Sequence, residues 1–454
     1  MPPRFRTFGC GLVLIACAAL AVRLAFTLAV APDVRALPEP TDAGAYHLLA
    51  NDLADGRGYV RPYDLELVRT VRPTAEYPPL FPALLSVVSR AGGDTVGAQR
   101  LAMCFVGAGT VVLIGLLGRR VAGPAVGLVA AGLAAVYPML FQSDAVLMPE
   151  TLYAFLVACV LLLAYRAVDH PSVVRFGVLG LAVGAAVLTR AEAIFLVVLL
   201  VVPLAVMLRD VHPRRRLALG ACAVGATLVL VLPWTARNYA RFDEVVPVST
   251  NVGSALDGAN CREMYKGPFK GLWRYSPNCF EGFLQPELAA GNEATASDAH
   301  RADGLRYARQ HAGEVPGVMA VRWLRTFGFY DSARQVRFEA LEWRKARWQT
   351  LGMRMYWALL PFAALGTAVL VRRRPGRAAH EERRPGTPAH EERRPVWPLL
   401  STVALVSLTT ALTYGNQRFR IAAEPALLVL AATGVTAVLR RLAILPGAAP
   451  PRGA

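Results

Sequence analysis

Long apolar stretches alternate with short polar connections along most of this chain. The hydrocarbon core of a bilayer requires a helix of roughly 17 to 25 mainly apolar residues, and ten stretches come close to that length. The predicted spans cover residues 8–31, 98–117, 124–142, 151–167, 174–189, 192–208, 217–233, 353–371, 396–414 and 421–439. We therefore expect an all-α polytopic membrane protein with about ten transmembrane helices.

The distribution of arginine predicts the orientation of these spans. Basic residues in short loops are retained on the cytoplasmic side of a membrane. Twenty arginines fall in short connections on the side of the N-terminus, whereas the short connections of the other side carry only Arg190, Arg418 and Arg420. We therefore expect a multi-pass protein of the cytoplasmic (inner) membrane, N-in and C-in, with the two long segments 32–97 and 234–352 outside.

The first outer segment contains two predicted helices. The spacing of its apolar residues favours an amphipathic helix over 43–54 that lies on the membrane surface, is closed by Gly56 and Gly58, and turns Asp52 toward solvent. Residues 80–88 are apolar but too few to cross a bilayer, and they follow prolines. This second pattern indicates a surface or re-entrant helix.

The second outer segment is less apolar than the spans. Residues 318–348 combine tryptophan, phenylalanine and arginine at helix-compatible spacing, a pattern typical of helices that lie in the lipid headgroup layer. Cys261 and Cys279 are the only cysteines of the outer segments. An oxidising compartment favours a disulfide between them.

The chain divides into consecutive parts. Between Arg372 and Pro395 the sequence AHEERRP occurs twice in a charged, proline-bearing stretch that is typical of a disordered linker. The expected parts are an N-terminal transmembrane core over 1–233 with the first outer loop 32–97, an extracytoplasmic segment over 234–352, a transmembrane helix over 353–371, the cytoplasmic linker 372–395, a C-terminal transmembrane hairpin over 396–441 and a tail over 442–454.

Composition and charge agree with a membrane protein and argue against a soluble protein and against a nucleic-acid-binding protein. With 55% hydrophobic residues and a mean hydropathy of +0.39, the chain of 454 residues is too apolar for a soluble protein. Its net charge of +17 comes almost wholly from arginines in short connections, so topology explains the charge better than nucleic-acid binding does. The first apolar run follows Arg4 and Arg6 as in a signal peptide, but it is too long for an h-region, and we expect it to remain as the first span.

Ionisable residues gather at the predicted outer ends of the spans. Such groups are costly to keep near lipid, which makes each of them a candidate for function. The set comprises Asp42, Glu76 beside Tyr77, Asp144, Glu150, Arg190, Glu192, Arg237, Arg418 and Arg420. Carboxylates opposite arginines suit the transfer of a group from an anionic lipid phosphate to a hydroxyl, because the carboxylate accepts the hydroxyl proton while guanidinium groups hold the phosphate.

Each candidate also has a purely structural interpretation. Asp42 precedes a predicted helix and suits its N-cap, and Glu150 opens a span where an acid favours the helix dipole. Arg190 and Glu192 suit an interfacial ion pair, and Arg418 suits contact with lipid headgroups. These alternatives stay open at the level of the sequence.

Two further features of the spans favour structure over chemistry. The glycine-rich stretch 107–118 lies in an apolar span, so helix packing explains it better than a nucleotide-binding loop does. Arg23, inside the first span, is expected to reach a neighbouring acid or the outer headgroups.

The order of several motifs resembles a known family. The motifs are YPPLFP, AAVYPMLFQSDAVLMPETLYAF, LTRAEA, LPWTARNYARF and the terminal QRFRIAAEPALL. Over residues 8–250 and 396–440 the chain resembles the GT-C superfamily of membrane glycosyltransferases, more narrowly the bacterial members related to protein O-mannosyltransferases and aminoarabinose transferases.

The resemblance implies polyprenyl-monophosphate sugar donors, inverting transfer and an active site outside the cytoplasmic membrane. It also implies that an acid of the first outer loop is the catalytic base, which corresponds to Asp42. Many relatives have two adjacent acids there, whereas Ala43 follows Asp42 in this chain. No cofactor is therefore assigned, and a divalent metal is not supported by the sequence.

The resulting hypothesis is an integral membrane glycosyltransferase with Asp42 as general base. Asp144 and Glu150 would assist it, and arginines would hold the lipid phosphate, while the acceptor is a lipid, a glycan or a protein. The alternative is a polytopic lipid or solute transporter or flippase without transferase activity. Transporters typically consist of two similar halves, and no such repeat is visible here. A non-catalytic scaffold is a third interpretation.

Overall fold

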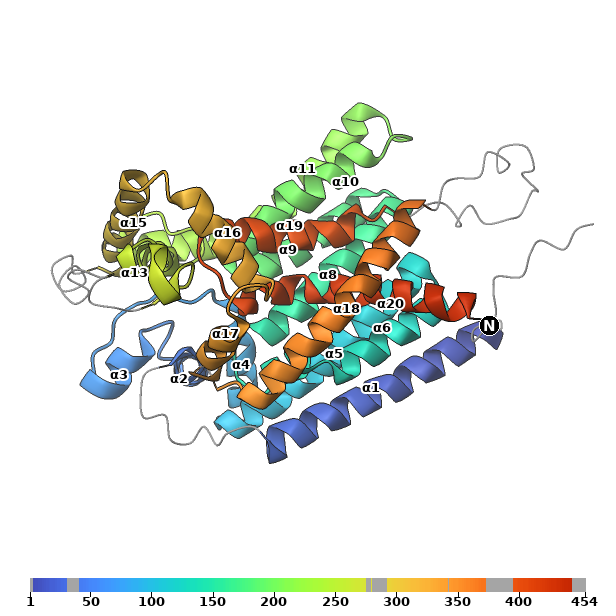
Figure 1. The fold of residues 1–454 in the computed structure, drawn as a ribbon. Coiled ribbons are helices and arrows are strands. Elements are labelled where there is room, and N and C mark those ends of the chain that lie inside the picture. The colour runs from blue at the N-terminus through green and yellow to red at the C-terminus, as the bar shows by residue number, and fades with distance from the viewer. Residues whose placement is uncertain are drawn as a thin grey trace, which may run out of the picture.

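The structure of the protein is a computed structural model that describes residues 3–30, 41–274, 279, 292–341, 343–372 and 395–442. These residues form helices and connecting segments without a β-strand, apart from one isolated bridge between Val60 and Pro73. Figure 1 shows a bundle of long helices with shorter helices gathered at one end of it. The all-α class predicted from the sequence is confirmed.

The bundle contains five helices that are long and apolar enough to cross a membrane, among the residues described. They are α1 (Pro3–Ala29), α5 (Val96–Ala122), α8 (Glu150–Asp169), α11 (Pro213–Phe242) and α18 (Ala346–Arg372). The pair α6 (Pro124–Val136) and α7 (Pro138–Asp144) passes the same test but bends by 56°, as in a broken span or a re-entrant loop.

The remaining predicted spans are helical at the expected places but shorter. They are α9 (Val173–Val187), the succession of η1 (Ala191–Ile194), η2 (Val197–Val201) and α10 (Val202–Met207), α19 (Trp397–Leu412), and η5 (Gln417–Ala422) followed by α20 (Glu424–Arg441). α11 also continues past the expected end of its span at 233. The helical positions are thus confirmed, and the number of membrane crossings stays a prediction.

Glycines bring neighbouring helices of the bundle into close contact. A Cβ on Gly366 of α18 would meet the backbone of α20, and a Cβ on Gly434 of α20 would meet the backbone of α18. Gly118 and Gly127 act in the same way between α5 and α6, where a Cβ on Gly118 would lie 3.1 Å from the Gly127 Cα. The helix-packing interpretation of the stretch 107–118 is therefore confirmed.

The shorter helices come from the two long connecting segments. They are α2 (Asp42–Ala54), α3 (Pro62–Val68), α4 (Leu80–Arg90), α12 (Asn251–Asp257), α13 (Arg262–Tyr265), η3 (Gly267–Phe269), α15 (Glu293–Gln310), α16 (Val315–Thr326) and α17 (Ser332–Leu341). Figure 1 shows most of them at the end of the bundle opposite the N-terminus. α2 and α4 confirm the two helices predicted in the first outer segment.

The expectation that Asp52 faces solvent is wrong. Asp52 is only 5% exposed, and its Oδ1 accepts a hydrogen bond of 2.7 Å from Nε of Arg57. α2 packs against both α3 and α4. α3 and α4 therefore cover faces of α2 that would be exposed if α2 lay alone on a membrane surface.

Two arginines of the segment 318–348 are buried rather than directed at lipid headgroups. Arg322 and Arg325 of α16 are 3% and 0% exposed. Arg322 donates to the carbonyl of Ala259 at 2.7 Å, and Arg325 donates to the carbonyl of Lys270 at 2.6 Å. They fasten the preceding loop to α16, so the predicted headgroup position is wrong for these two side chains.

Cys261 and Cys279 form a disulfide in the same region, with Cα atoms 5.1 Å apart. Residues 373–394 of the predicted linker and 443–454 of the predicted tail lie outside the described residues.

Candidate functional site

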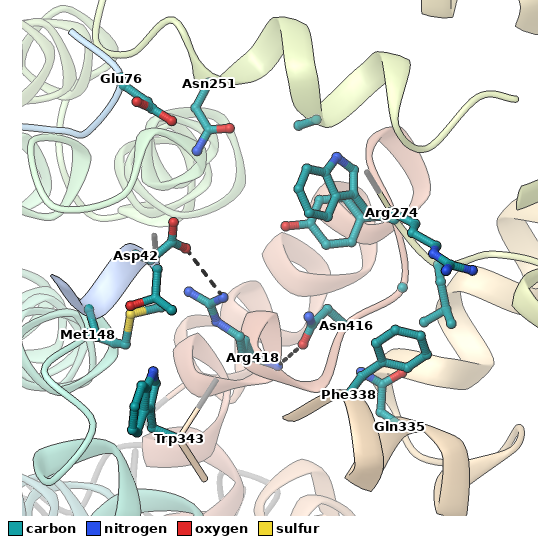
Figure 2. A pocket seen from close by; sticks show the side chains of 17 residues that line it. Asp42, Glu76, Met148, Asn251, Arg274, Gln335, Phe338, Trp343, Asn416 and Arg418 are labelled. Atoms are coloured by element: carbon teal, nitrogen blue, oxygen red, sulfur yellow. Dashed lines mark hydrogen bonds and ion pairs between the residues drawn. The ribbon is translucent and has the colours of Figure 1, made fainter. Parts of the chain in front are cut away.

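A cavity of about 340 Å³ lies where the two outer segments meet the end of the helix bundle. Its lining comes from six parts of the chain that are far apart in sequence. The lining residues are Thr41, Asp42, Ala43, Glu76, Met148, Asn251, Ala255, Leu272, Trp273, Arg274, Gln335, Phe338, Trp343, Tyr414, Gly415, Asn416 and Arg418. Figure 2 shows Asp42 and Arg418 next to each other at this cavity, joined by an ion pair.

Asp42 is the first residue of α2 and presents its carboxylate to the cavity. The N-cap of α2 is Thr41, whose hydroxyl accepts a hydrogen bond of 3.2 Å from the Gly44 amide. The Asp42 side chain is therefore not needed as the cap and is 47% exposed. Its Oδ1 accepts a hydrogen bond of 3.1 Å from the Tyr77 hydroxyl, and its Oδ2 lies 3.8 Å from Nη1 of Arg418.

Tyr77 is a fixed donor to this carboxylate. Burial raises the pKa of Tyr77 well above its ordinary value, and the nearby charges of Glu76 and Asp42 act in the same direction. The phenol therefore stays protonated and donates to Asp42. Its ring packs against Tyr46 with centroids 4.7 Å apart, which fixes its position.

Arg418 is held by a completely buried acid. Nε of Arg418 donates to Oε1 of Glu150 at 2.7 Å, and the backbone amide of Arg418 donates to the Asn416 side chain at 2.8 Å. Glu150 is the first residue of α8 and is 0% exposed. Burial of a charge is costly unless it is paired and hydrogen-bonded, and the bond from Arg418 to Oε1 offsets part of this cost.

Arg190 is the second cation on Glu150. Its Nη1 donates to Glu150 Oε1 at 3.1 Å, and its Nε donates to Glu192 Oε1 at 2.6 Å. Arg190 does not line the cavity itself, and its guanidinium carbon lies 5.4 Å from the ring centroid of Phe419. Glu150 thus joins Arg190 to Arg418, and Arg418 approaches Asp42.

Glu76 lines another wall of the cavity, near Asn251 in Figure 2. Its backbone is fixed from two sides: the Ser249 hydroxyl donates to its carbonyl, and its amide donates to the Thr74 hydroxyl at 3.0 Å.

Asp144 is placed in the bundle rather than at the cavity. It is 2% exposed, pairs with Nε of Arg23 at 2.7 Å and accepts a hydrogen bond of 2.8 Å from the Thr151 hydroxyl. The expectation that Arg23 reaches a neighbouring acid is confirmed. The catalytic candidate Asp144 is therefore the partner of a buried arginine, and the structure does not bring it to Asp42.

Arg237 and Arg420 are also engaged away from the cavity. The Arg237 guanidinium donates to the carbonyls of Thr74 and Tyr59 at 2.7 and 2.8 Å. Arg420 is 1% exposed and donates through Nε to Glu424 at 2.6 Å. Neither lines the cavity, so of the predicted phosphate-binding arginines only Arg418 does.

Sequence reasoning missed the aromatic and amide residues of the cavity. Trp273, Tyr414 and Trp343 line it together with Gln335 and other uncharged side chains. Tryptophan and tyrosine are common in loops near membranes, so their spacing gave no signal. Trp343 is distinguished by a backbone φ of 70°, which a bulky residue rarely adopts, but this feature is visible only in the structure.

Within the described part of the chain, no group of three or more His, Cys, Asp or Glu side chains is placed to hold a metal ion. The neighbours of Asp42 are Tyr77 and Arg418 rather than a second acid. No step of the chemistry below involves a metal.

A family model and the fold relate this chain to known proteins. The family described as dolichyl-phosphate-mannose-protein mannosyltransferase matches residues 76–235. The archaeal oligosaccharyltransferase AglB from Archaeoglobus fulgidus, in complex with an inhibitory peptide and a dolichol-phosphate, superposes with a TM-score of 0.53 and 13% sequence identity over 98% of this chain and 52% of that chain. The family model thus covers about a third of this chain, and the AglB match shows a similar fold over nearly all of it.

Two further solved structures resemble this chain to different degrees. The Archaeoglobus fulgidus oligosaccharyltransferase tethered to an acceptor peptide matches with a TM-score of 0.53 and 14% identity over 96% of this chain and 50% of that chain. ArnT from Cupriavidus metallidurans, bound to undecaprenyl phosphate, gives a TM-score of 0.42 and 18% identity over 96% of this chain and 80% of that one. This chain spans about half the length of the oligosaccharyltransferases. No curated protein sequence matches it.

Proposed function

We propose that this protein is a membrane glycosyltransferase that moves a sugar from a polyprenyl-monophosphate carrier to a hydroxyl of an acceptor. The observation that carries the proposal is the meeting of Asp42 and Arg418 in one cavity, with Oδ2 and Nη1 3.8 Å apart. A carboxylate and a guanidinium side by side provide the two functions that this transfer requires, a proton acceptor and an anion holder. The dolichol-phosphate in the AglB structure agrees with a donor of this class.

Asp42 is the general base of the proposed reaction. Its carboxylate takes the proton of the acceptor hydroxyl as the hydroxyl oxygen forms a bond to the anomeric carbon of the donor sugar. The bond between that carbon and the phosphate oxygen breaks, and polyprenyl phosphate leaves with the electron pair. A single displacement of this kind inverts the anomeric configuration.

Arg418 receives the departing phosphate. Negative charge increases on the phosphate as the bond breaks, and a guanidinium fixed in advance stabilises this charge without reorganisation. Glu150 holds Arg418 by accepting a hydrogen bond from the Arg418 Nε. The Nη1 atom of Arg418 is directed toward Asp42. Arg190 stabilises Glu150 as a buried carboxylate. In this arrangement Glu150 is a positioning residue.

The proposed reaction takes place at the outer face of the cytoplasmic membrane. Support comes from the asymmetric distribution of arginine between short connections, which predicts that residues 32–97 and 234–352 are outside. Both segments contribute to the cavity. No nucleotide sugar is available there, which agrees with a lipid-linked donor.

The direct test is transfer from labelled polyprenyl-phosphate sugars in membranes that contain the protein. We expect Asp42→Asn to lower transfer by at least about 100-fold, because the amide accepts no proton at neutral pH. The matched control is Asp55→Asn at the other end of α2, where the carboxylate is 55% exposed and pairs with Arg57. This control should retain nearly full activity.

Two results would contradict the proposal. Undiminished transfer by Asp42→Asn would remove the assigned base. Movement of the intact lipid-linked sugar across the membrane, without cleavage of the sugar–phosphate bond in any member of the donor panel, would instead favour the transporter alternative.

A further inference from the structure

The wall of the cavity away from Asp42 takes no part in the reaction proposed above. It consists of Trp273, Arg274, Gln335 and Tyr414, from the second outer segment and the loop after α19. Figure 2 shows Arg274 and Gln335 on the opposite side of Arg418 and Asn416 from Asp42. A molecule bound against this wall would reach toward the base.

Two aromatic rings form the centre of this wall. The centroids of Trp273 and Tyr414 lie 6.0 Å apart with planes inclined by 32°, so the rings form a continuous aromatic surface. The indole Nε1 of Trp273 donates to the carbonyl of Ser254 at 2.9 Å, and Tyr414 packs on Phe419 at 4.9 Å. Both rings are therefore held in place from behind before any ligand binds.

One amide lies on this wall and another lies beside Glu76 at the edge of the cavity. Gln335 is 0% exposed, and its Oε1 has no hydrogen-bond partner among the described residues. A buried carbonyl without a partner is costly, and a hydroxyl of a ligand in the cavity would relieve this cost. Asn251 uses its Oδ1 to accept from the Ser254 hydroxyl at 2.9 Å, which leaves its amide nitrogen as a donor toward the cavity.

A cation completes the wall. Arg274 is exposed and has no carboxylate partner among the described residues, and its guanidinium lies 4.8 Å from the ring centroid of Phe269. A guanidinium stacked in this way is fixed in orientation and still able to donate hydrogen bonds.

We propose that this wall is the acceptor subsite and that the acceptor is a saccharide. The C–H face of a sugar ring packs on aromatic rings, while its hydroxyl groups pair with amides and a guanidinium. A peptide bound by strand addition would need a sheet edge, and the described chain offers no strand; peptide acceptors bound in other ways are an outcome of the test below. The volume of about 340 Å³ is at the small end of ligand pockets and suits a terminal sugar unit. The inference rests on the proposed transferase function.

The test uses the purified full chain, a polyprenyl-phosphate sugar that it cleaves, and two acceptor pools from the envelope of the host cell. One pool contains released oligosaccharides and the other contains peptides from proteolysis. We expect label to enter the oligosaccharides. Trp273→Ala should raise the KM for this acceptor by about tenfold or more. Trp273→Phe, which keeps an aromatic face, should restore most of the affinity.

The matched control is Trp323→Ala. Trp323 is 38% exposed on α16, donates to the Ser407 hydroxyl at 3.0 Å and does not line the cavity. Unfolding temperatures of all variants in detergent separate a binding defect from a folding defect. A folded Trp273→Ala variant with unchanged acceptor KM would overturn the inference, and so would label only in the peptide pool. If wild-type protein cleaves no donor, the proposed function fails before the acceptor is tested.

Discussion

Arg418 lies between two carboxylates with different surroundings. Glu150, 268 residues away in sequence, is completely buried and holds Nε, whereas Asp42 is half exposed and lies near Nη1. The buried acid is paired with two arginines through Oε1 and is shielded from the cavity, so it is unsuited to accept a proton. The exposed acid has one phenolic donor and open space beside it. These environments separate the positioning role of Glu150 from the base role of Asp42.

Replacement of Glu150 tests this division at the residue scale. Glu150→Gln keeps the shape but removes the charge between Arg190 and Arg418, and loss of one partner of a buried pair is strongly unfavourable. We expect kcat/KM for the donor to fall by about 10- to 100-fold, mainly through donor KM, because Arg418 loses its fixed orientation.

Glu192→Gln is the matched control, because its side chain is 17% exposed and it pairs with Arg190. This substitution leaves the bond from Arg418 to Glu150 in place, so the loss should be no more than about fivefold. Equal losses in both variants, measured with the same lipid-linked sugar, would argue against a special position of Glu150.

Close helix packing sets the geometry of the bundle at the scale of elements. α18 and α20 approach each other through Gly366 and Gly434. α20 directly follows the short helix η5, which carries Arg418 of the site. The place of Arg418 thus depends on how closely α20 packs. Small residues permit such approach in membrane proteins, where packing rather than water exclusion drives association.

A methyl group at this contact should separate the two helices. We expect Gly366→Ala to lower the unfolding temperature of the detergent-solubilised protein, because its Cβ would overlap the backbone of α20. Gly132→Ala on α6 is the control, since a Cβ there would meet nothing within 4 Å. Alanine is the better helix former by about 0.5–1 kcal/mol, so the control should be neutral or slightly more stable. Equal destabilisation in both would contradict this account of the contact.

At the scale of the whole molecule, the two outer segments lie together at one end of the helix bundle. The described residues of the segments 41–76 and 251–343 lie at one end of the bundle, and α1 begins at the other end in Figure 1. This polarity agrees with the arginine-based prediction that both termini are cytoplasmic. The cavity would then open at the outer face, where a lipid-linked sugar is available.

Reporter fusions test this topology. Alkaline phosphatase fused after Asp243, just beyond α11, should be active, because we expect that end of the helix to be outside. The same enzyme fused after Ala454 should be inactive, and green fluorescent protein at that position should fluoresce. The reverse pattern would place the cavity in the cytoplasm and remove the argument for a lipid-linked donor.

The sequence by itself determined the class of protein, most helix positions, and the candidates Asp42 and Arg418. These features depend on local hydrophobic pattern and on the cost of charge near lipid, which are properties of short stretches. Only the tertiary structure decided which charged groups meet. Arg237, Arg420 and Asp144 resembled Arg418 and Asp42 in sequence, yet their partners lie elsewhere in the fold. The wall of Trp273 and Tyr414 likewise appeared only in the structure, because it depends on contacts between segments distant in the chain.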